Sequence, residues 1–392
     1  MNPTPLTADD SPLAPRTRLL IDDLHRQERD KALVLPTDDP LDPKRRRRVE
    51  LTHDEMWAQP EAVRRTLAKE RRAIAEVAAV CAKRSLDRIV MVGCGDSLAS
   101  MLAVRALYEQ LLGIPCEPIQ ALDFTYYYAG TAGDRVLVVA LSSSGVTTRA
   151  VEALLLARAQ GALTLGLSNT PGSPVMTEGD LCLTVHAERK GWPTQASTAA
   201  MMVLYQLGLD LARAIHGGSA HIDDLETALH RTPDNIAQVL ERHDGAVAAI
   251  AEKEAHRHIY LYSGGGPAYA CALFGAAKVK ECATSHAIAI PLEEYHHYNS
   301  QKSGDPLFLI APRGPSLARA LDTAMDGRRW GGQVYAITTE GDTMLSGFVD
   351  QQLELPEMPE LLVPMVYTVP VQLFAYHTAM AKFRQAQESA GA

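Results

Sequence analysis

The sequence predicts an α/β protein that is a tandem duplication of one parallel-sheet domain, and three observations support this prediction. Short apolar, β-branched runs alternate with helical stretches, which is typical of a parallel sheet covered by helices on both faces. Glycine-rich turns separate the strands from the helices that follow them. The same succession of runs recurs about 170 residues later, so that "RIVMVGCGDS" is matched by "HIYLYSGGGP".

Composition narrows the class of protein. The 392 residues allow two or three domains, and a hydrophobic content of 46% with 22% charged residues is ordinary for a globular protein. A net charge of −9 argues against a nucleic-acid partner, because no broad basic surface is available for phosphates. No apolar run approaches the roughly 20 residues of a membrane span, so we expect no membrane partner. Six scattered cysteines predict reduced thiols and a cytoplasmic location.

The N-terminal segment, residues 1–48, is predicted to be a polar, partly disordered arm. It is rich in proline and aspartate, unlike a signal peptide, and ends in the basic run Lys44–Arg48. This run is interpreted as solvated surface, with a docking or nucleic-acid role as the alternative. Apolar residues at helical spacing then predict lead-in helices over residues 49–74.

Strand, turn and helix patterns divide the rest of the chain. The first domain is predicted over residues 75–215, with strands in "RIVMVG", "RVLVVAL", "ALTLGLS" and "LCLTV". Residues 216–245 are predicted to form a helical connector. The second domain is predicted over residues 246–392, with "HAIAIP" expected to be a strand that crosses the core.

The loop Ser142–Thr147 predicts a phosphate site in the first domain. It follows a buried strand and opens a helix, where free backbone N–H groups lie at the positive end of the helix dipole. Gly145 lets a ligand approach the backbone, and hydroxyl groups come from Ser142, Ser143, Ser144 and Thr147. A helix cap in a polar loop is the simpler alternative, but four hydroxyl groups exceed what a cap needs. The matching loop of the second domain, "APRGPSLA", has one hydroxyl group.

The turn Gly93–Ser97 offers two more candidate side chains. It lacks the full G-x-G-x-x-G spacing, so a dinucleotide cofactor is not expected. Asp96 or Ser97 could cap the following helix, or could face a ligand held by the neighbouring serine loop.

Charged residues gather around an apolar run at residues 278–297. Lys278 and Glu281 are three residues apart, so on a helix they share one face. A surface ion pair is one interpretation and proton-transfer machinery is the other. A metal site at His296 and His297 is not expected, because no known ligand spacing accompanies them.

These motifs resemble the sugar isomerase (SIS) family, and in particular the isomerase half of glucosamine-6-phosphate synthase. The resemblance covers about Leu51 to Lys382 and rests on "GCGDSLAS", "ALSSSGVT", "TQASTAA", "GAAKVKECATSHA", "LEEYHH" and "YTVPVQLFAYHTAMAK". It implies two SIS domains, each with a flavodoxin-like parallel sheet flanked by helices, and no cofactor or metal.

The resemblance also implies roles for individual residues. The sugar phosphate would be held by Ser97, Ser142, Ser143, Ser144 and Thr147. The backbone of Ala196 and Ser197 would touch the sugar. Glu281 would move a proton between C1 and C2, supported by Lys278. His297 would open the sugar ring and, in the family, reaches in from the partner subunit of a homodimer.

The residue types suit this chemistry. Aldose–ketose interconversion needs one base that returns the proton to the adjacent carbon, and a partly desolvated carboxylate can do so. Ring opening needs a group that titrates near neutrality, which a histidine supplies.

Three departures from the family pattern concern the substrate. We expect no amidotransferase domain in this chain, and the C-terminus "AKFRQAQESAGA" lacks the family's terminal lysine segment. Asp96 replaces a threonine, and Val146 replaces a glutamate. Asp96 could accept a hydrogen bond from a substrate amine or serve as a cap.

The function that these patterns predict is an aldose–ketose isomerase, or an isomerase and deaminase, acting on a sugar phosphate or amino-sugar phosphate. A fructosamine-6-phosphate deglycase is a second enzymatic reading. A non-catalytic sugar-phosphate-binding regulator is the alternative from another class, although the chain has no helix-turn-helix pattern.

Overall fold

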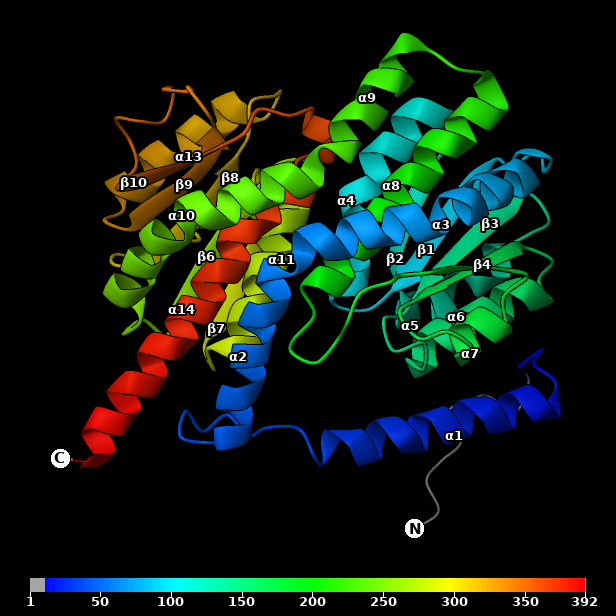
Figure 1. The fold of residues 1–392 in the computed structure, drawn as a ribbon, viewed down its shortest axis with the longest axis horizontal. Helices are drawn as coiled ribbons and strands as arrows, with labels where there is room; N and C mark the ends of the chain where they lie inside the picture. Colours follow the sequence, from blue (N-terminus) through cyan, green and yellow to red (C-terminus); the bar gives the residue numbers. More distant parts are fainter. Residues whose placement is uncertain (1–10, 392) are drawn as a thin grey trace.

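The computed structural model of the chain describes residues 11–391, so residues 1–10 and 392 lie outside the described part. Two five-stranded parallel sheets, flanked by helices, confirm the predicted α/β fold with tandem domains. Figure 1 shows the two sheets on either side of a central layer of helices.

The first sheet has the strand order β2-β1-β3-β4-β5. Its strands are β1 (Arg88–Gly93), β2 (Cys116–Gln120), β3 (Val136–Leu141), β4 (Leu163–Ser168) and β5 (Leu181–Thr184). Side chains alternate across the sheet. Ile89 and Met91 therefore join the central core, while Val90 and Val92 join an outer core. Burial of both faces explains why these strands are continuous apolar runs.

The second sheet has the order β10-β9-β8-β6-β7. Its strands are β6 (Ile259–Gly264), β7 (His286–Pro291), β8 (Pro306–Ala311), β9 (Gln333–Thr339) and β10 (Gln351–Leu355). Strand β7 corrects one expectation, because it lies at the sheet edge instead of crossing the core. Its Ile288 is 50% exposed.

Helices pack in a central layer between the sheets and in outer layers beyond them. The central helices are α3 (Gln59–Ala82), α4 (Asp96–Leu112), α8 (Gln195–His216), α10 (Thr232–Glu254), α11 (Ala268–Cys282) and α14 (Pro364–Gly391). The outer and connecting helices are α5 (Ala121–Asp123), η1 (Phe124–Tyr128), η2 (Ala129–Thr131), α6 (Thr148–Ala159), α7 (Pro174–Thr177), α9 (Ala220–His230), α12 (Glu294–His297), α13 (Leu317–Arg329) and η3 (Glu360–Leu362). The predicted connector corresponds to α9 and the first part of α10.

The N-terminal segment differs from the partly disordered arm that its composition predicts. Within the described residues it forms α1 (Pro15–Ala32) and α2 (Pro43–Trp57). Ile21 and Leu24 of α1 are buried against α6 in the outer core of the first domain, and α2 packs beside α14 (Figure 1). These two apolar side chains are three positions apart, so they share one helix face that the first domain covers.

The basic run also departs from the predicted solvated surface. Arg45 is only 4% exposed, and its guanidinium group donates to the backbone oxygen of Glu281 at 2.7 Å and pairs with Asp38 at 2.7 Å. Arg48 lies against the ring of Trp192. The run is therefore partly built into the protein, because Arg45 has acceptors from the arm and the second domain and Arg48 packs on an aromatic ring.

Candidate active site between the two domains

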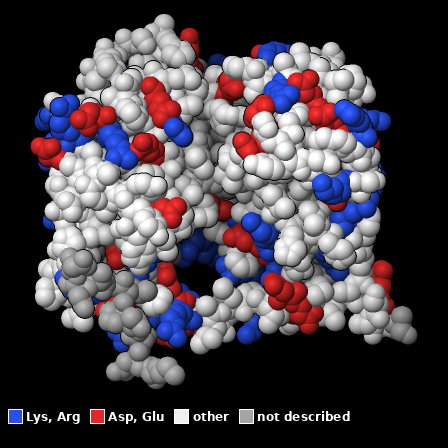
Figure 2. Space-filling view, turned by 180° about the vertical axis from the view of Figure 1, so that it is seen from behind, with Lys and Arg blue, Asp and Glu red and all other residues white. Residues whose placement is uncertain are grey.

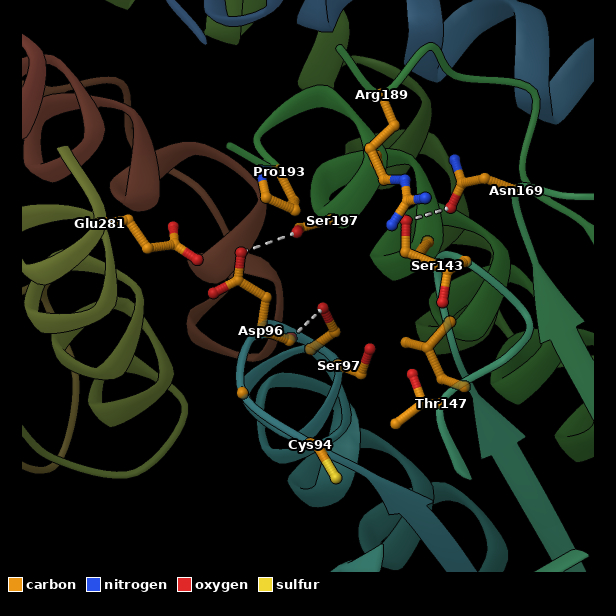
Figure 3. Close-up of a pocket in the computed structure, with 16 residues that line it drawn as sticks. Cys94, Asp96, Ser97, Ser143, Thr147, Asn169, Arg189, Pro193, Ser197 and Glu281 are labelled. Atoms are coloured by element: carbon orange, nitrogen blue, oxygen red, sulfur yellow. Dashed lines mark hydrogen bonds between the residues drawn. The ribbon is translucent and has the colours of Figure 1, made fainter. Parts of the chain in front are cut away.

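One cavity of about 290 Å³ lies at the carboxyl ends of β1 and β3, where parallel sheets commonly bind ligands. Figure 3 shows that its walls come from both domains. The predicted residues that line it are Asp96, Ser97, Ser143, Ser144, Thr147, Ala196, Ser197 and Glu281. Segments nearly 200 positions apart in the chain therefore meet in one site.

The serine loop forms one wall of the cavity. Ser143 donates through Oγ to Asn169 Oδ1 at 2.9 Å, and Ser144 and Thr147 border the cavity at the start of α6. The loop places hydroxyl groups beside the N-terminal end of a helix, where backbone N–H groups favour an anion. This wall is suited to a phosphate group.

Ser142 has a different position from its neighbours. It is 1% exposed, and its Oγ accepts from the backbone N–H of Gly145 at 3.0 Å and contacts Thr147 Oγ1 at 2.8 Å. Ser142 does not line the cavity, although the sequence groups it with the phosphate ligands. Its hydroxyl group instead holds the loop in shape, because it lies behind the wall.

Gly145 is required by the shape of this loop. Its φ of +70° lies in the left-handed region, and a Cβ there would come within 1.9 Å of Ser173 Oγ. A larger residue would therefore suffer both backbone strain and a steric clash.

The opposite wall is built around a buried lysine. Lys278 is fully buried, and its Nζ lies 2.6 Å from Asp96 Oδ2 and also pairs with the Glu281 carboxylate. Asp96 further accepts from Ser197 Oγ at 3.3 Å. Asp96 does not cap α4 through its side chain, which excludes the capping role within the residues described. One ammonium group thus serves two carboxylates from different domains.

The environment changes the acidity of these groups. Burial raises the pKa of Glu281 above its ordinary value, and Asp96 adds to the increase, while Lys278 opposes it. Burial alone would lower the pKa of Lys278, but Asp96 and Glu281 together raise it above the ordinary value. Lys278 is therefore a permanent cation, and Glu281 is a carboxylate that gains a proton more readily than usual.

Several residues that line the cavity were not predicted from the sequence as site residues. Arg189 and Asn169 extend the wall formed by the serine loop, and Figure 3 shows Arg189 directed toward Ser143. Cys94 lines the floor, and burial raises the pKa of its thiol. Arg189 lies in the irregular segment between β5 and α8, which has no motif that would mark it as a ligand-binding residue.

His297 lies outside the cavity of its own chain. Its side chain is 60% exposed at the end of α12, with Nε2 3.6 Å from Glu293. His296 is instead packed inward and contacts Asp326 at 3.1 Å and Thr323 at 2.9 Å. The two adjacent histidines thus face different surroundings.

The described residues, 11–391, show neither a metal cluster nor a membrane-spanning helix. They contain no cluster of three or more histidine, cysteine, aspartate or glutamate side chains placed to hold a metal ion. None of their helices combines the length and apolar character needed to cross a membrane.

Comparison with known proteins agrees with this arrangement. A family model described as "SIS domain" matches residues 84–209 and 253–382, one match for each sheet. The chain is 33% identical over 303 residues to a glutamine–fructose-6-phosphate aminotransferase (isomerizing) of Escherichia coli. That alignment covers 76% of this chain and 49% of the relative, so the chain spans about half the length of that relative.

Solved structures show the same fold. The C-terminal domain of glucosamine-fructose-6-phosphate aminotransferase from Francisella tularensis superposes with a TM-score of 0.77 at 23% identity, covering 84% of this chain and 96% of that one. A glucosamine-6-phosphate deaminase from Thermotoga maritima gives a TM-score of 0.66 at 19% identity, covering 84% and 94%.

Proposed function

Because the chain belongs to the SIS domain family, we propose that it is a sugar-phosphate isomerase, or an isomerase and deaminase. Its substrate would be a sugar phosphate or amino-sugar phosphate of the glucosamine-6-phosphate and fructose-6-phosphate type. The observation that supports this proposal is one cavity with hydroxyl groups at one end and a lysine-held carboxylate at the other. The E. coli relative has "isomerizing" in its name. The proposal includes isomerisation and not amino transfer from glutamine, because the chain spans about half of that protein.

The phosphate would bind at the serine loop. Ser143, Ser144 and Thr147 offer hydroxyl donors, and the start of α6 offers backbone N–H groups. Arg189 adds a full positive charge on the same side of the cavity. Hydrogen bonds to a charged acceptor are the stronger kind, so this wall would provide most of the binding energy.

Proton transfer would occur at the opposite wall. Glu281 would remove the proton from C2 of the open-chain sugar and deliver it to C1, through an enediol or enolamine, and the reverse reaction would use the same steps. Its raised pKa suits this role, because the group must accept and release a proton with similar ease. Lys278 would keep the resting carboxylate ionised, and it holds Asp96 as well.

Ring opening would need a second chain. We propose a homodimer in which His297 enters the cavity of the partner subunit, which is consistent with its 60% exposure and its position away from the cavity of its own chain. A mixture of Glu281→Gln and His297→Ala proteins would then regain about one quarter of wild-type activity, since mixed dimers hold one intact site. Two inactive variants that stay inactive when mixed would refute the shared site.

The test of the proposed reaction is exchange of a carbon-bound proton with solvent, at C2 of glucosamine 6-phosphate and at C1 of fructose 6-phosphate, whose C2 is the carbonyl carbon. Fructose 6-phosphate and glucosamine 6-phosphate are incubated in D₂O and followed by NMR, with coupled detection of any released ammonia. Wild-type protein should exchange the proton, and Glu281→Gln should lose about 10²–10⁴-fold in rate. Equal rates for both proteins on every accepted substrate would overturn the mechanism.

The alternative functions give different results in the same experiment. A deglycase would release an amine only from fructosamine 6-phosphates. A regulator would bind a sugar phosphate in calorimetry and show neither exchange nor turnover. Melting temperatures across a set of sugar phosphates would identify the accepted ligand, because a specific ligand stabilises the folded state by mass action.

A further inference from the structure

A second hollow beside the candidate active site is lined mainly by cationic residues. It has a volume of about 480 Å³ and is formed by Pro43, Lys44, Arg47, Arg48, Leu51 and Lys190. We call these six residues the basic pocket. Four of them carry a positive charge and none is acidic, although the whole chain has a net charge of −9. Outside the pocket lining, Lys190 pairs with the exposed Glu188 at 2.6 Å and Arg47 lies 3.7 Å from Glu50. Such a concentration of one sign of charge favours an anionic ligand.

Arg48 is the residue of the basic pocket that has a buried hydrogen-bond donor without a partner. Its guanidinium group lies 3.5 Å from the centre of the Trp192 ring, which fixes its plane. The Nε of Arg48 and the Nε1 of Trp192 are both buried without a hydrogen-bond partner. Both are donors, so only an acceptor can satisfy them. By contrast, Arg46, two residues earlier on α2, pairs with Glu50 at 3.2 Å.

The basic pocket is held rigidly against the segment that borders the active-site cavity. Glu55 accepts from the backbone N–H of Gly191 at 3.1 Å, and Thr52 Oγ1 accepts from the backbone N–H of Trp192 at 2.8 Å. Helix α2 therefore forms one side of the pocket and also holds the loop that forms the other. Because these contacts order the loop before any ligand arrives, little entropy would be lost on binding.

The basic pocket is also close to the proposed catalytic carboxylate. Arg189 and Pro193 line the active-site cavity, while Lys190 lines the basic pocket, so a single loop separates the two. Arg45, three positions before Arg48 on α2, donates to the backbone oxygen of Glu281 at 2.7 Å, so this part of α2 lies beside the end of α11. A ligand with its phosphate at the serine loop would therefore have its C1 and C2 end on the side of the cavity nearer Arg48.

We propose that the basic pocket is a second oxyanion site, which binds a carboxylate or phosphate group through Arg48 and Lys190. The oxyanion could be an acidic substituent on the C1 or C2 nitrogen of the sugar phosphate, and this source rests on the function proposed above. It could also be a free anion that binds independently of the sugar. The two sources share one chemistry, and separate ligands distinguish them.

The experiment uses calorimetry and Trp192 fluorescence on the full chain. The substrate-borne source is probed with fructosamine 6-phosphate carrying glycine on its nitrogen, compared with the same compound carrying methylamine. The free source is probed with inorganic pyrophosphate. Arg48→Met keeps an apolar side chain against Trp192 but removes the charge, and Arg46→Gln is the matched control on the same helix. Melting temperatures establish that both variants fold.

The expected result is a preference of about tenfold or more for the ligand that reaches Arg48, since a hydrogen bond to a charged group has about this effect on affinity. If the glycine compound binds better than the methylamine compound and Arg48→Met abolishes the difference, the oxyanion belongs to the substrate. If pyrophosphate binding is weakened by Arg48→Met and the two compounds bind alike, the oxyanion is free. The Arg46→Gln protein should match wild type in either case.

The proposal is overturned if Arg48→Met and Arg46→Gln bind all three ligands equally. Failure of the proposed reaction has a separate signature, because proton exchange on fructose 6-phosphate does not involve the basic pocket. If the protein lacks proton exchange but binds pyrophosphate through Arg48, the proposed isomerase function is wrong and the proposed oxyanion site is still supported.

Discussion

The two domains have the same fold, but the loops that follow corresponding strands of their sheets carry different side chains. In the first domain, the loop after β3 has four hydroxyl groups, and Ser143, Ser144 and Thr147 line a cavity. In the second, the loop after β8 has an arginine, Arg313, that pairs with Glu357 at 2.6 Å. The hollow beside that loop contains Arg319, which is paired with Glu293 at 2.7 Å.

This difference indicates a division of labour between the two copies. The first copy lines its cavity with polar side chains, whereas the arginines at and beside the corresponding loop of the second copy pair with acidic residues of that copy. The second copy contributes instead through the end of α11, which brings Lys278 and Glu281 to the first copy's cavity. After duplication, one copy can specialise in binding and the other in chemistry, because a fold does not prescribe which of its loops binds.

The surface of the molecule shows where the two copies meet. Figure 2, seen from behind, shows charged residues of both signs spread over the two domains and a deep hollow between them at the lower edge. Basic side chains are visible inside this hollow. Interspersed charges elsewhere are ordinary for a protein surface, so the hollow is the distinctive region of this face.

The largest expected effect comes from removing the lysine that joins the two copies. Lys278→Met would leave the partly buried carboxylates of Asp96 and Glu281 without their cation, and we expect a loss of about 3 kcal/mol in the free energy of unfolding. Lys280→Met, an exposed neighbour on the same helix, should change it by less than about 0.5 kcal/mol. Chemical denaturation measures both. Equal free energies of unfolding for the Lys278→Met and Lys280→Met proteins would contradict the conclusion that the Lys278 ion pairs hold the two copies together.

The second expected effect compares one glycine in each loop. Gly145→Ala combines a left-handed backbone with a clash against Ser173, so we expect a loss of about 2–4 kcal/mol and no sugar-phosphate binding. Gly314→Ala, in the second copy, would meet only the Glu360 side chain, which can move, and should cost about 1 kcal/mol or less. Thermal unfolding of the two variants measures the difference, and a reversed order would contradict it.

The third prediction concerns pH. Glu281 must be ionised to act as a base, so proton exchange should rise with pH through a pKa above the ordinary value of 4.5. Burial is the main cause of this raised pKa, Asp96 adds to it and Lys278 opposes it. The acidic limb of the exchange rate should therefore move to lower pH in Asp96→Asn and to higher pH in Lys278→Met. Shifts in the same direction would refute the assignment of the base.

The smallest expected effect comes from removing one hydroxyl group from the serine loop, compared with removing one from the corresponding loop of the second copy. Ser144→Ala removes a candidate phosphate donor, so glucosamine 6-phosphate should bind about tenfold more weakly in calorimetry. Ser316→Ala removes the hydroxyl group of the second-copy loop and should leave the affinity unchanged. A loss of affinity in the Ser316→Ala protein would indicate that the phosphate binds at the second-copy loop, and would contradict the proposed site.

Much of the fold was predictable because its signals are local. Apolar runs such as "RVLVVAL" and "PLFLIA" identify strands whose two faces are both buried, and glycine turns mark where helices follow. The serine loop was visible for the same reason, since four hydroxyl groups, a glycine and a following helix lie within a few residues. The helical arm was not predictable, because α1 is stabilised by contacts with α6 that its polar, proline-rich composition does not reveal.

The sequence by itself therefore determined the two parallel-sheet domains, the hydroxyl-rich loop Ser142–Thr147 and the Lys278–Glu281 spacing, since each depends on neighbours in the chain. Only the tertiary structure decided that Lys278 pairs with Asp96 from the other domain and that Ser142 lies behind the cavity wall. The same holds for Arg189, which borders the cavity, and for Arg48, which lies against Trp192. These contacts join residues far apart in the sequence, and they depend on how the two domains and the arm pack, which no local pattern encodes.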